Sequence, residues 1–372
     1  MFYSITINRN CNFNCLYCYQ KNKSHTVISD ATIDNISNFI LKNAVELNDT
    51  EVLINISGGE CLLYPDKVKS VIENIRCNLT KNNFPDPIIE VSTNISLFTK
   101  DIYDFFKETN CKLFIGFDGI EESQNMNRLF NNKTKTFNDC FEKLQLLKDD
   151  KNYANKVTIN SVISNNNVQY LNENFIWLTS TFPDFNISFN LAYNSNWNNQ
   201  SLQLLENQLY ALAESYYAKL LTAPEYSINI FDRQIEMILK EHQSMDYLCG
   251  ATKSSLGITC EGDIIACSTC TGMSCENEFI IGNVNIGIDN FKKQEFLQRL
   301  TRIDGNEKCR ECQFNKRCYK YCPSSNFLSS GDMFKVSRTM CELNKKLIEV
   351  SEYILIKLYD YDKDIVHVSS KI

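Results

Sequence analysis

Three cysteines occupy positions 11, 15 and 18 near the start of the chain, in the stretch CNFNCLYC. The spacing C-x3-C-x2-C can present three thiolates to one face of a [4Fe–4S] cluster, which leaves the fourth iron without a protein ligand. An open metal position can bind an exogenous group, as it does in catalytic metal sites. Zinc, or three unconnected thiols, is the alternative. The triplet therefore predicts a cluster with one open position at Cys11, Cys15 and Cys18.

The chain has 17 cysteines in 372 residues. It has neither a secretion signal at its N-terminus nor a ~20-residue apolar run, so the default compartment is the cytoplasm. Disulfides are rare there, and regularly spaced cysteines indicate metal or cluster ligands. The later cysteines follow a fixed spacing: Cys249-x12-Gly262-x4-Cys267, then Cys309-x2-Cys312-x5-Cys318-x3-Cys322, and Cys341 after 18 further residues. A zinc ribbon would explain only positions 309–322.

Composition excludes several classes of function. The net charge of −7, from 38 basic and 45 acidic residues, argues against a nucleic-acid or anionic-membrane binder. The three histidines, His25, His242 and His367, are far apart and follow no ligand-like spacing. We therefore expect no catalysis by histidine acid–base chemistry, and we assign no general acid or base.

The elements that must position these cysteines alternate between strand and helix in the first ~190 residues, which favours an α/β fold with parallel strands. Amphipathic helices are expected at 30–47, capped by Ser29, and at 66–81, 99–108, 136–149 and 168–181. Strands are expected at 2–7, 52–56, 88–92, 112–117, 157–163 and 187–191. Six such units fit a partial (β/α)6 barrel, with a doubly wound sheet as the alternative.

Unusual motifs collect where these strands end. The cysteine triplet follows the first strand, SGGE (57–60) the second, STN (92–94) the third and FDG (117–119) the fourth. Both architectures place function at the carboxyl edge of the sheet. We therefore expect these motifs to form one site.

The stretch C-x3-C-x2-Tyr-C resembles the signature of the radical S-adenosylmethionine (SAM) superfamily, and the likeness covers nearly the whole chain. The resemblance implies that SAM binds the open iron and that a reduced cluster cleaves it to a 5′-deoxyadenosyl radical. It assigns Cys11, Cys15 and Cys18 to the cluster. The SAM contacts that it implies are Tyr17, Gly58, Gly59, Glu60, Ser92, Asn94 and Arg128.

Arg128 belongs to the stretch NMNRLF, which resembles sulfatase-maturating relatives in which an arginine pairs with the SAM carboxylate. A surface arginine on a loop is the alternative. A serine that those relatives keep two residues before the Asp-Gly pair is Gly116 here, so we expect that contact to be lost. We expect Cys77, Cys111 and Cys140 to be ordinary buried thiols.

The later cysteines are similar to the seven-cysteine SPASM extension of radical SAM enzymes, which holds two auxiliary [4Fe–4S] clusters. The resemblance gives Cys309, Cys312, Cys318 and Cys341 to the distal cluster, and Cys249, Cys267 and Cys322 to the proximal one. Two clusters need eight thiolates, so one ligand is missing. Cys260, Cys270 or Cys275 supplies it, with Cys270 and Cys275 favoured, or one iron stays open and could bind a substrate thiol.

SPASM relatives usually act on peptides or proteins. Anaerobic sulfatase-maturating enzymes carry an Asp after the second SPASM cysteine as a base, but this chain has Ser268. We therefore favour a maturase that forms a thioether, a carbon cross-link or a related oxidation in a ribosomally made precursor peptide. The third hypothesis is a scaffold that binds clusters or zinc and has no catalytic activity.

The resemblance also implies a flavodoxin- or ferredoxin-type reductant. Because the first strand begins at residue 2, we expect no leader-binding domain, so leader recognition falls to the barrel rim, the SPASM face or a separate partner. The expected organisation is a barrel at 1–200, a helical bridge at 201–245, an auxiliary cluster domain at 246–345 and a final helix and tail at 346–372.

Overall fold

The computed structural model describes residues 1–21, 23–240, 250–300, 307–320 and 322–361. Two compact units can be distinguished, each built from separate stretches of the chain. The first comprises 1–116, 128–158 and 250–299, and the second 117–127, 159–249 and 300–372.

The sheet of the first unit is centred on β1 (Phe2–Thr6), which pairs in parallel with β2 (Leu53–Ser57) on one side and β7 (Ser255–Ile258) on the other. Phe2 lies opposite both Leu53 and Ser255. The strand order within this unit is β10-β9-β8-β7-β1-β2-β3-β4. The remaining strands are β3 (Ile88–Thr93), β4 (Lys112–Gly116), β8 (Asp263–Ile265), β9 (Ile280–Asn283) and β10 (Gly287–Ile288).

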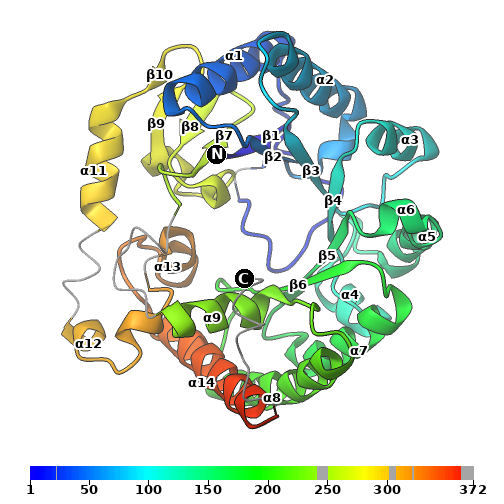
Figure 1. The fold of residues 1–372 in the computed structure, drawn as a ribbon, viewed down its shortest axis with the longest axis vertical. Coiled ribbons are helices and arrows are strands. Elements are labelled where there is room, and N and C mark those ends of the chain that lie inside the picture. Colours follow the sequence, from blue (N-terminus) through cyan, green and yellow to red (C-terminus); the bar gives the residue numbers. More distant parts are fainter. Residues whose placement is uncertain (22, 241–249, 301–306, 321, 362–372) are drawn as a thin grey trace. The chain divides into compact units, whose positions relative to one another are not determined.

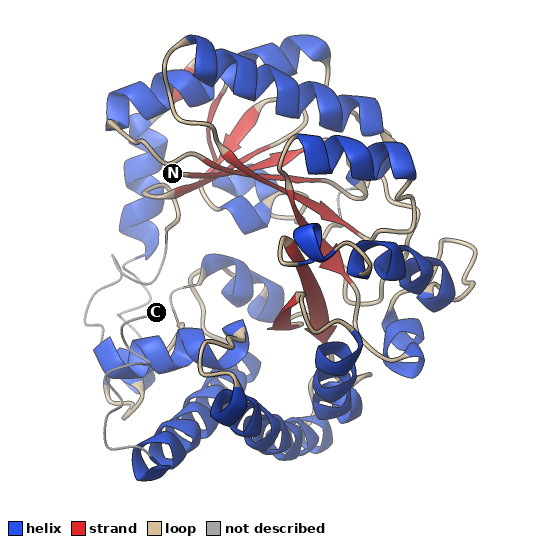
Figure 2. Cartoon of the chain, turned by 45° about the vertical axis from the view of Figure 1, so that its right-hand side comes forward, coloured by secondary structure: helices blue, strands red, loops and turns tan. Residues whose placement is uncertain are grey.

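Helices of the first unit cover one side of the strands β1–β4, with α1 and α2 packed against each other (Figure 1). Ser29 caps α1 by accepting the N–H of Thr32, and the apolar face of α1 is buried through residues such as Ile33 and Ile40. Figure 2 shows the strands beneath these helices. The helices are α1 (Asp30–Leu47), α2 (Pro65–Lys81), α3 (Lys100–Glu108), α5 (Phe137–Lys148), α6 (Lys151–Ala154) and α11 (Asn290–Leu300).

The second unit contains β6 (Asn186–Leu191) and most of β5 (Val157–Ile163), with a hydrogen bond of 2.8 Å from Ala192 N–H to the carbonyl of Ile163. Its long helix α14 packs against both α8 and α9. The helices are α4 (Glu121–Asn127), α7 (Leu171–Thr181), α8 (Asn199–Thr222), α9 (Asn229–Lys240), α12 (Glu307–Arg310), α13 (Pro323–Ser330) and α14 (Arg338–Tyr361).

The predicted α/β class with a parallel, open sheet core, as in a partial barrel, is confirmed. Beyond β7 the sheet continues with the antiparallel pairs β7–β8, β8–β9 and β9–β10. The helix expected at 30–47 and its Ser29 cap are confirmed too, whereas the one expected at 168–181 begins as a 3-10 turn, Val168–Tyr170, before α7. The range 201–245 is helical as expected as far as Lys240, and 241–245 lies outside the described residues. The predicted domain boundaries stay a prediction. None of the described helices is long and apolar enough to cross a membrane.

Candidate functional site

The three cysteines of the triplet lie in the loop that follows β1, and none of them is fully buried. The N–H of Cys18 donates to the carbonyl of Cys15 at 3.1 Å. The sulfur of Cys11 accepts the N–H of Phe13 at 3.4 Å and lies close enough to Cys18 for their charges to interact. Burial raises the pKa of Cys11 to about 11, against that hydrogen bond. The loop therefore brings Cys11 and Cys18 close together and leaves all three thiols partly exposed.

Gly58 and Gly59 follow β2 and face the same loop. A Cβ atom at Gly58 would stand 2.4 Å from Oδ1 of Asn8, and one at Gly59 would stand 2.2 Å from the carbonyl oxygen of Asn10. The N–H groups of Gly59 and Glu60 donate to the carbonyls of Asn8 and Asn10, each at 3.0 Å. The approach that these glycines permit is thus between the loops after β1 and β2, because a side chain would separate them.

Glu60 ties the end of β2 to the end of β3. The residue is 1% exposed, and its carboxylate accepts hydrogen bonds from the Thr93 hydroxyl and the Asn94 N–H, both at 2.7 Å, and from the Leu62 N–H at 3.0 Å. Burial raises the pKa of Glu60 above its usual range, although these hydrogen bonds lower it. The carboxylate is therefore held in one orientation at this edge.

Asn94 joins the end of β3 to the cysteine loop. Its side-chain nitrogen donates to Oδ1 of Asn12 at 2.8 Å and lies 3.9 Å from the sulfur of Cys11. Ser92 lies on β3 itself, where its hydroxyl accepts a hydrogen bond from Asn55 at 2.8 Å. Both residues expected from the STN motif are thus at the predicted edge, and Asn94 contacts the loop directly.

Arg128 is 7% exposed, so it is not a surface arginine. Its guanidinium carbon lies 5.4 Å from the centre of the Tyr17 ring, within cation–π range. Its Nη1 fills the space beside Gly116, where a Cβ atom would stand 2.5 Å away. The loss of the serine at position 116 is thus matched by an arginine side chain that lies there instead.

Two further buried thiols lie at the same edge. Cys61, directly after Glu60, and Cys140 each donate their S–H to a backbone carbonyl at the end of β3, at 3.3 and 3.4 Å. Burial raises the pKa of both, that of Cys140 to about 12. The expectation of buried thiols is confirmed for Cys111 and Cys140. It is wrong for Cys77, which α2 turns to solvent on the face away from its buried apolar residues.

Four of the later cysteines belong to the first unit, and all are buried: Cys260, Cys267, Cys270 and Cys275. Cys267 precedes the 3-10 turn Ser268–Cys270, and a hydrogen bond from the Cys270 side chain lowers the pKa of Cys267 to about 7, against its burial. Cys275 lies near Cys267 at the range of a charge interaction. The thiol of Cys260 donates instead to Glu261 at 3.3 Å.

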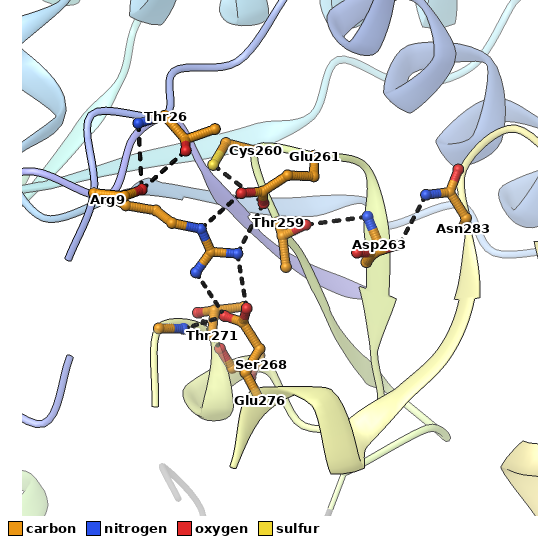
Figure 3. A network of polar contacts seen from close by, with 12 residues as sticks. Arg9, Thr26, Thr259, Cys260, Glu261, Asp263, Ser268, Thr271, Glu276 and Asn283 are labelled. Atoms are coloured by element: carbon orange, nitrogen blue, oxygen red, sulfur yellow. Dashed lines mark hydrogen bonds and ion pairs between the residues drawn. The ribbon is translucent and has the colours of Figure 1, made fainter. Parts of the chain in front are cut away.

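Arg9 links this cysteine segment to the loop after β1 (Figure 3). Its guanidinium donates to both carboxylate oxygens of Glu261 at 2.8 Å, and to those of Glu276 at 2.7 and 3.1 Å. Glu276 also accepts the N–H of Gly272, whose carbonyl accepts the N–H of Lys21 at 2.9 Å. Polar contacts before and after the cysteine triplet therefore hold the segment 267–276.

Five described cysteines belong to the second unit: Cys309, Cys312, Cys318, Cys322 and Cys341. Burial, reinforced by the charges of the nearby Cys341, Cys309 and Cys312, raises the pKa of Cys318 to about 12. The sulfur of Cys322 lies 3.2 Å from the hydroxyls of two serines at the start of α13. Cys249 lies outside the described residues. The four cysteines that the resemblance gives to one cluster are thus neighbours in space.

Sequence reasoning missed several residues that build this site. Thr93 stands between the two residues expected from the STN motif, and this position in the motif could have identified it as a site residue. Asn12 lies inside the cysteine loop without a recognisable pattern, and Arg9 has partners far along the chain. His25 is exposed, and the other two histidines lie outside the described residues.

The cysteine loop fits an iron–sulfur cluster better than a single ion. Among the described residues, no three Cys, His, Asp or Glu side chains are placed to hold one metal ion. A [4Fe–4S] cluster makes a different demand, because each thiolate binds a separate iron. Three thiols on one loop, none of them fully buried, can meet that demand.

Comparison with known proteins identifies several relatives of this chain. Residues 5–171 match the sequence model of the radical SAM superfamily. An uncharacterized protein of Methanocaldococcus jannaschii is 27% identical over 76% of this chain and 87% of its own length. The radical SAM cyclopropyl synthase TigE of Paramaledivibacter caminithermalis is 22% identical over 92% and 72%, respectively. A cysteine-type anaerobic sulfatase-maturating enzyme of Clostridium novyi is 21% identical over 84% and 85%.

Solved structures share the fold. The enzyme anSMEcpe, with bound AdoMet and the Cp18Cys peptide, has a TM-score of 0.77 at 19% identity and covers 97% of this chain and 99% of its own. Streptococcus suis SuiB, bound to precursor peptide SuiA, has a TM-score of 0.57 at 16% identity over 91% and 75%. Residues 5–171 are therefore a radical SAM domain, and the chain is similar over most of its length to radical SAM and sulfatase-maturating proteins.

Proposed function

We propose that this radical SAM enzyme is a peptide maturase. It would generate a 5′-deoxyadenosyl radical from SAM and abstract hydrogen from a ribosomally made precursor peptide, leaving a thioether, a carbon cross-link or a related oxidation. The observation that carries the proposal is the hydrogen-bonded assembly at the ends of β1, β2 and β3. Glu60 binds the N–H of Asn94, and Asn94 binds Asn12 of the cysteine loop.

Each part of this assembly has a role toward the cofactors. Cys11, Cys15 and Cys18 would hold one [4Fe–4S] cluster, which, when bound and reduced, supplies the electron that cleaves SAM. Arg128 offers a guanidinium, held against Tyr17, that suits a carboxylate. Glu60 is fixed by its backbone and Thr93 contacts and presents a carboxylate that suits an ammonium group. The proposed SAM contacts are Tyr17, Gly58, Gly59, Glu60, Ser92, Asn94 and Arg128.

Two auxiliary [4Fe–4S] clusters are part of the proposal. Cys309, Cys312, Cys318 and Cys341 would hold the distal cluster, which the proximity of these thiols supports. Cys249, Cys267 and Cys322 would hold the proximal one, together with Cys260, Cys270 or Cys275, or with an iron left open. A flavodoxin- or ferredoxin-type protein in the cytoplasm would supply electrons.

Peptides are the substrate class that the relatives favour. SuiB was solved with a precursor peptide and anSMEcpe with a peptide, and TigE is named a cyclopropyl synthase. The sulfatase-maturating alternative is supported by the Clostridium novyi relative. It is opposed by Ser268, whose hydroxyl accepts a hydrogen bond from Ser255 at 2.7 Å and is no carboxylate base.

Anaerobic reconstitution tests the proposal. We expect about twelve irons per chain, four for each of three clusters, and dithionite-dependent release of 5′-deoxyadenosine. Incubation with a peptide encoded beside the gene should change the peptide's mass, and a sulfatase-derived peptide should not react. A single bound zinc, or no SAM cleavage, would identify a non-catalytic scaffold and overturn the proposal. Conversion of the sulfatase peptide alone would select the alternative.

A further inference from the structure

The proposed function leaves one auxiliary ligand unassigned, and the identity of that ligand matters only if the proposed function holds. The resemblance provides seven thiolates where two [4Fe–4S] clusters take eight. Three unassigned thiols, Cys260, Cys270 and Cys275, lie in the same unit as Cys267. Their surroundings differ enough to distinguish them.

Cys270 is in direct contact with a predicted ligand. Its side chain hydrogen-bonds the thiol of Cys267, and its N–H donates to the carbonyl of Cys267 at 2.9 Å across the turn Ser268–Cys270. The spacing Cys267-x2-Cys270 repeats that of Cys309 and Cys312, and C-x2-C pairs are a common source of cluster ligands. Cys270 is also fully buried, as a ligand shielded from solvent would be.

Cys260 is committed to another partner. Its thiol donates to Oε2 of Glu261 at 3.3 Å, and the same carboxylate is held by Arg9 (Figure 3). Recruiting Cys260 to a cluster would bring a thiolate and cluster sulfides next to that carboxylate, and like charges at such distances repel. The polar network of Arg9 thus opposes ligation by Cys260.

Cys275 is a weaker candidate than Cys270. It interacts with Cys267 through charge rather than through a hydrogen bond. It is also followed by two acidic residues, Glu276 and Glu278, whose charges reach its thiol. Glu276 is turned to Arg9 and Gly272, so the segment around Cys275 is anchored by that carboxylate.

The segment that carries Cys270 is held in place. Gly272 has a φ of +79°, and a Cβ atom there would stand 3.0 Å from Cγ of Gln20, so the segment packs tightly on the chain that follows the cysteine triplet. Hydrogen bonds from Lys21 and to Glu276 fix the same glycine. The backbone next to Cys270 is therefore held, so that binding to separate irons asks only the side chains of Cys267 and Cys270 to turn.

We infer that Cys270 is the eighth auxiliary thiolate and binds the same cluster as Cys267. All irons of that cluster then have a protein ligand, so a substrate thiol does not coordinate it. This separates the protein from maturases in which an auxiliary iron would hold the substrate sulfur.

The test uses reconstituted full-length protein in which Cys11, Cys15 and Cys18 are replaced by alanine, so that only the auxiliary clusters contribute. This parent should bind about eight irons. Cys270→Ala should convert one cluster to a species with the EPR signal of an oxidised [3Fe–4S] cluster, or lose its iron. The matched variants Cys260→Ala and Cys275→Ala should keep the parent's iron content and Mössbauer spectrum.

A second measurement guards against a folding defect. Added 2-mercaptoethanol should restore the four-thiolate Mössbauer spectrum in Cys270→Ala and leave the parent unchanged. The inference is overturned if Cys270→Ala matches the parent, if Cys260→Ala or Cys275→Ala loses the cluster instead, or if the thiol alters the parent's spectrum. A parent without auxiliary clusters would instead refute the proposed function, so the two failures are distinct.

Discussion

Replacing Arg9 with methionine should destabilise the protein, mainly because the buried carboxylate of Glu276 loses its charged partner. The arginine side chain is 11% exposed and donates to both Glu276, which is 5% exposed, and Glu261, which is 39% exposed. Methionine keeps much of the buried stem but removes every charged contact. Glu276 would then be left in the interior with the Gly272 N–H as its remaining hydrogen bond.

The two partners contribute very differently to the expected loss. Removing one member of a buried ion pair costs about 3–5 kcal/mol, because the other charge is stranded. An exposed pair contributes about 0–1 kcal/mol. Glu276 belongs to the first case and Glu261 to the second. We therefore expect Arg9→Met to lower the free energy of unfolding by about 3 kcal/mol.

Urea unfolding of the reconstituted protein under anaerobic conditions, followed by circular dichroism, measures this change. Glu261→Gln is the matched control and should cost less than about 1 kcal/mol. Adding Glu276→Gln to Arg9→Met should recover stability, because the stranded charge is gone. The reasoning is refuted if Arg9→Met costs no more than Glu261→Gln, or if the double variant is no more stable than Arg9→Met.

Three other results are expected. Gly116→Ser should displace the guanidinium of Arg128 and weaken SAM binding roughly 10- to 100-fold, because a hydrogen bond to a charged group contributes about that much affinity. Equilibrium dialysis measures the dissociation constant of SAM, and a wild-type value would contradict this prediction. Burial raises the pKa of Glu261, but the Arg9 guanidinium outweighs it and lowers that pKa below its ordinary value of 4.5. Solvent screens this pair, because the Glu261 side chain is 39% exposed, so its contribution to stability stays small. The decrease in unfolding free energy caused by Glu261→Gln should therefore be constant above pH about 4.5 and become smaller as the pH falls below that value. A decrease that disappears already near neutral pH would refute this prediction. Iron removal should speed tryptic cleavage within 307–317, whose short helices bury no residue; equal rates with and without iron would show that ligation does not hold this segment.

Much of the fold was predictable because its signals are local. The strands that end in the cysteine triplet, in SGGE and in STN are short β-branched runs followed by small or polar residues, a pattern that needs no tertiary information. Helix α1 shows the same advantage, since its buried residues recur at helical spacing and Ser29 caps it. The ends of parallel strands meet at one edge, so the site followed from the strand order.

The residues that hold the site in place through contacts distant in sequence were not predictable from local patterns. Arg9 lies 252 positions from Glu261 and 267 from Glu276, a separation at which no periodicity or motif can pair them. The sequence indicated only that Gly116 replaces a serine. It could not indicate that the side chain of Arg128, which comes later in the chain after α4, fills the space beside this glycine. Helix α4 itself was missed because it buries polar residues, Ser123, Gln124 and Asn127, in place of an apolar stripe.

The position of β1 places the loop that follows it between two cysteine-bearing or glycine-rich segments. Within the first unit, β1 is hydrogen-bonded to β2 on one side and to β7 on the other, both parallel and both in register from Phe2. The loop after β1 therefore has the Gly58–Glu60 turn as one neighbour and the segment after β7 as the other. A one-residue slip of β1 would turn its side chains to the opposite face, and it would displace Asn8 from Gly58 and Arg9 from Glu276 together. The cysteine loop and the segment 267–276 are thus positioned by the same strand.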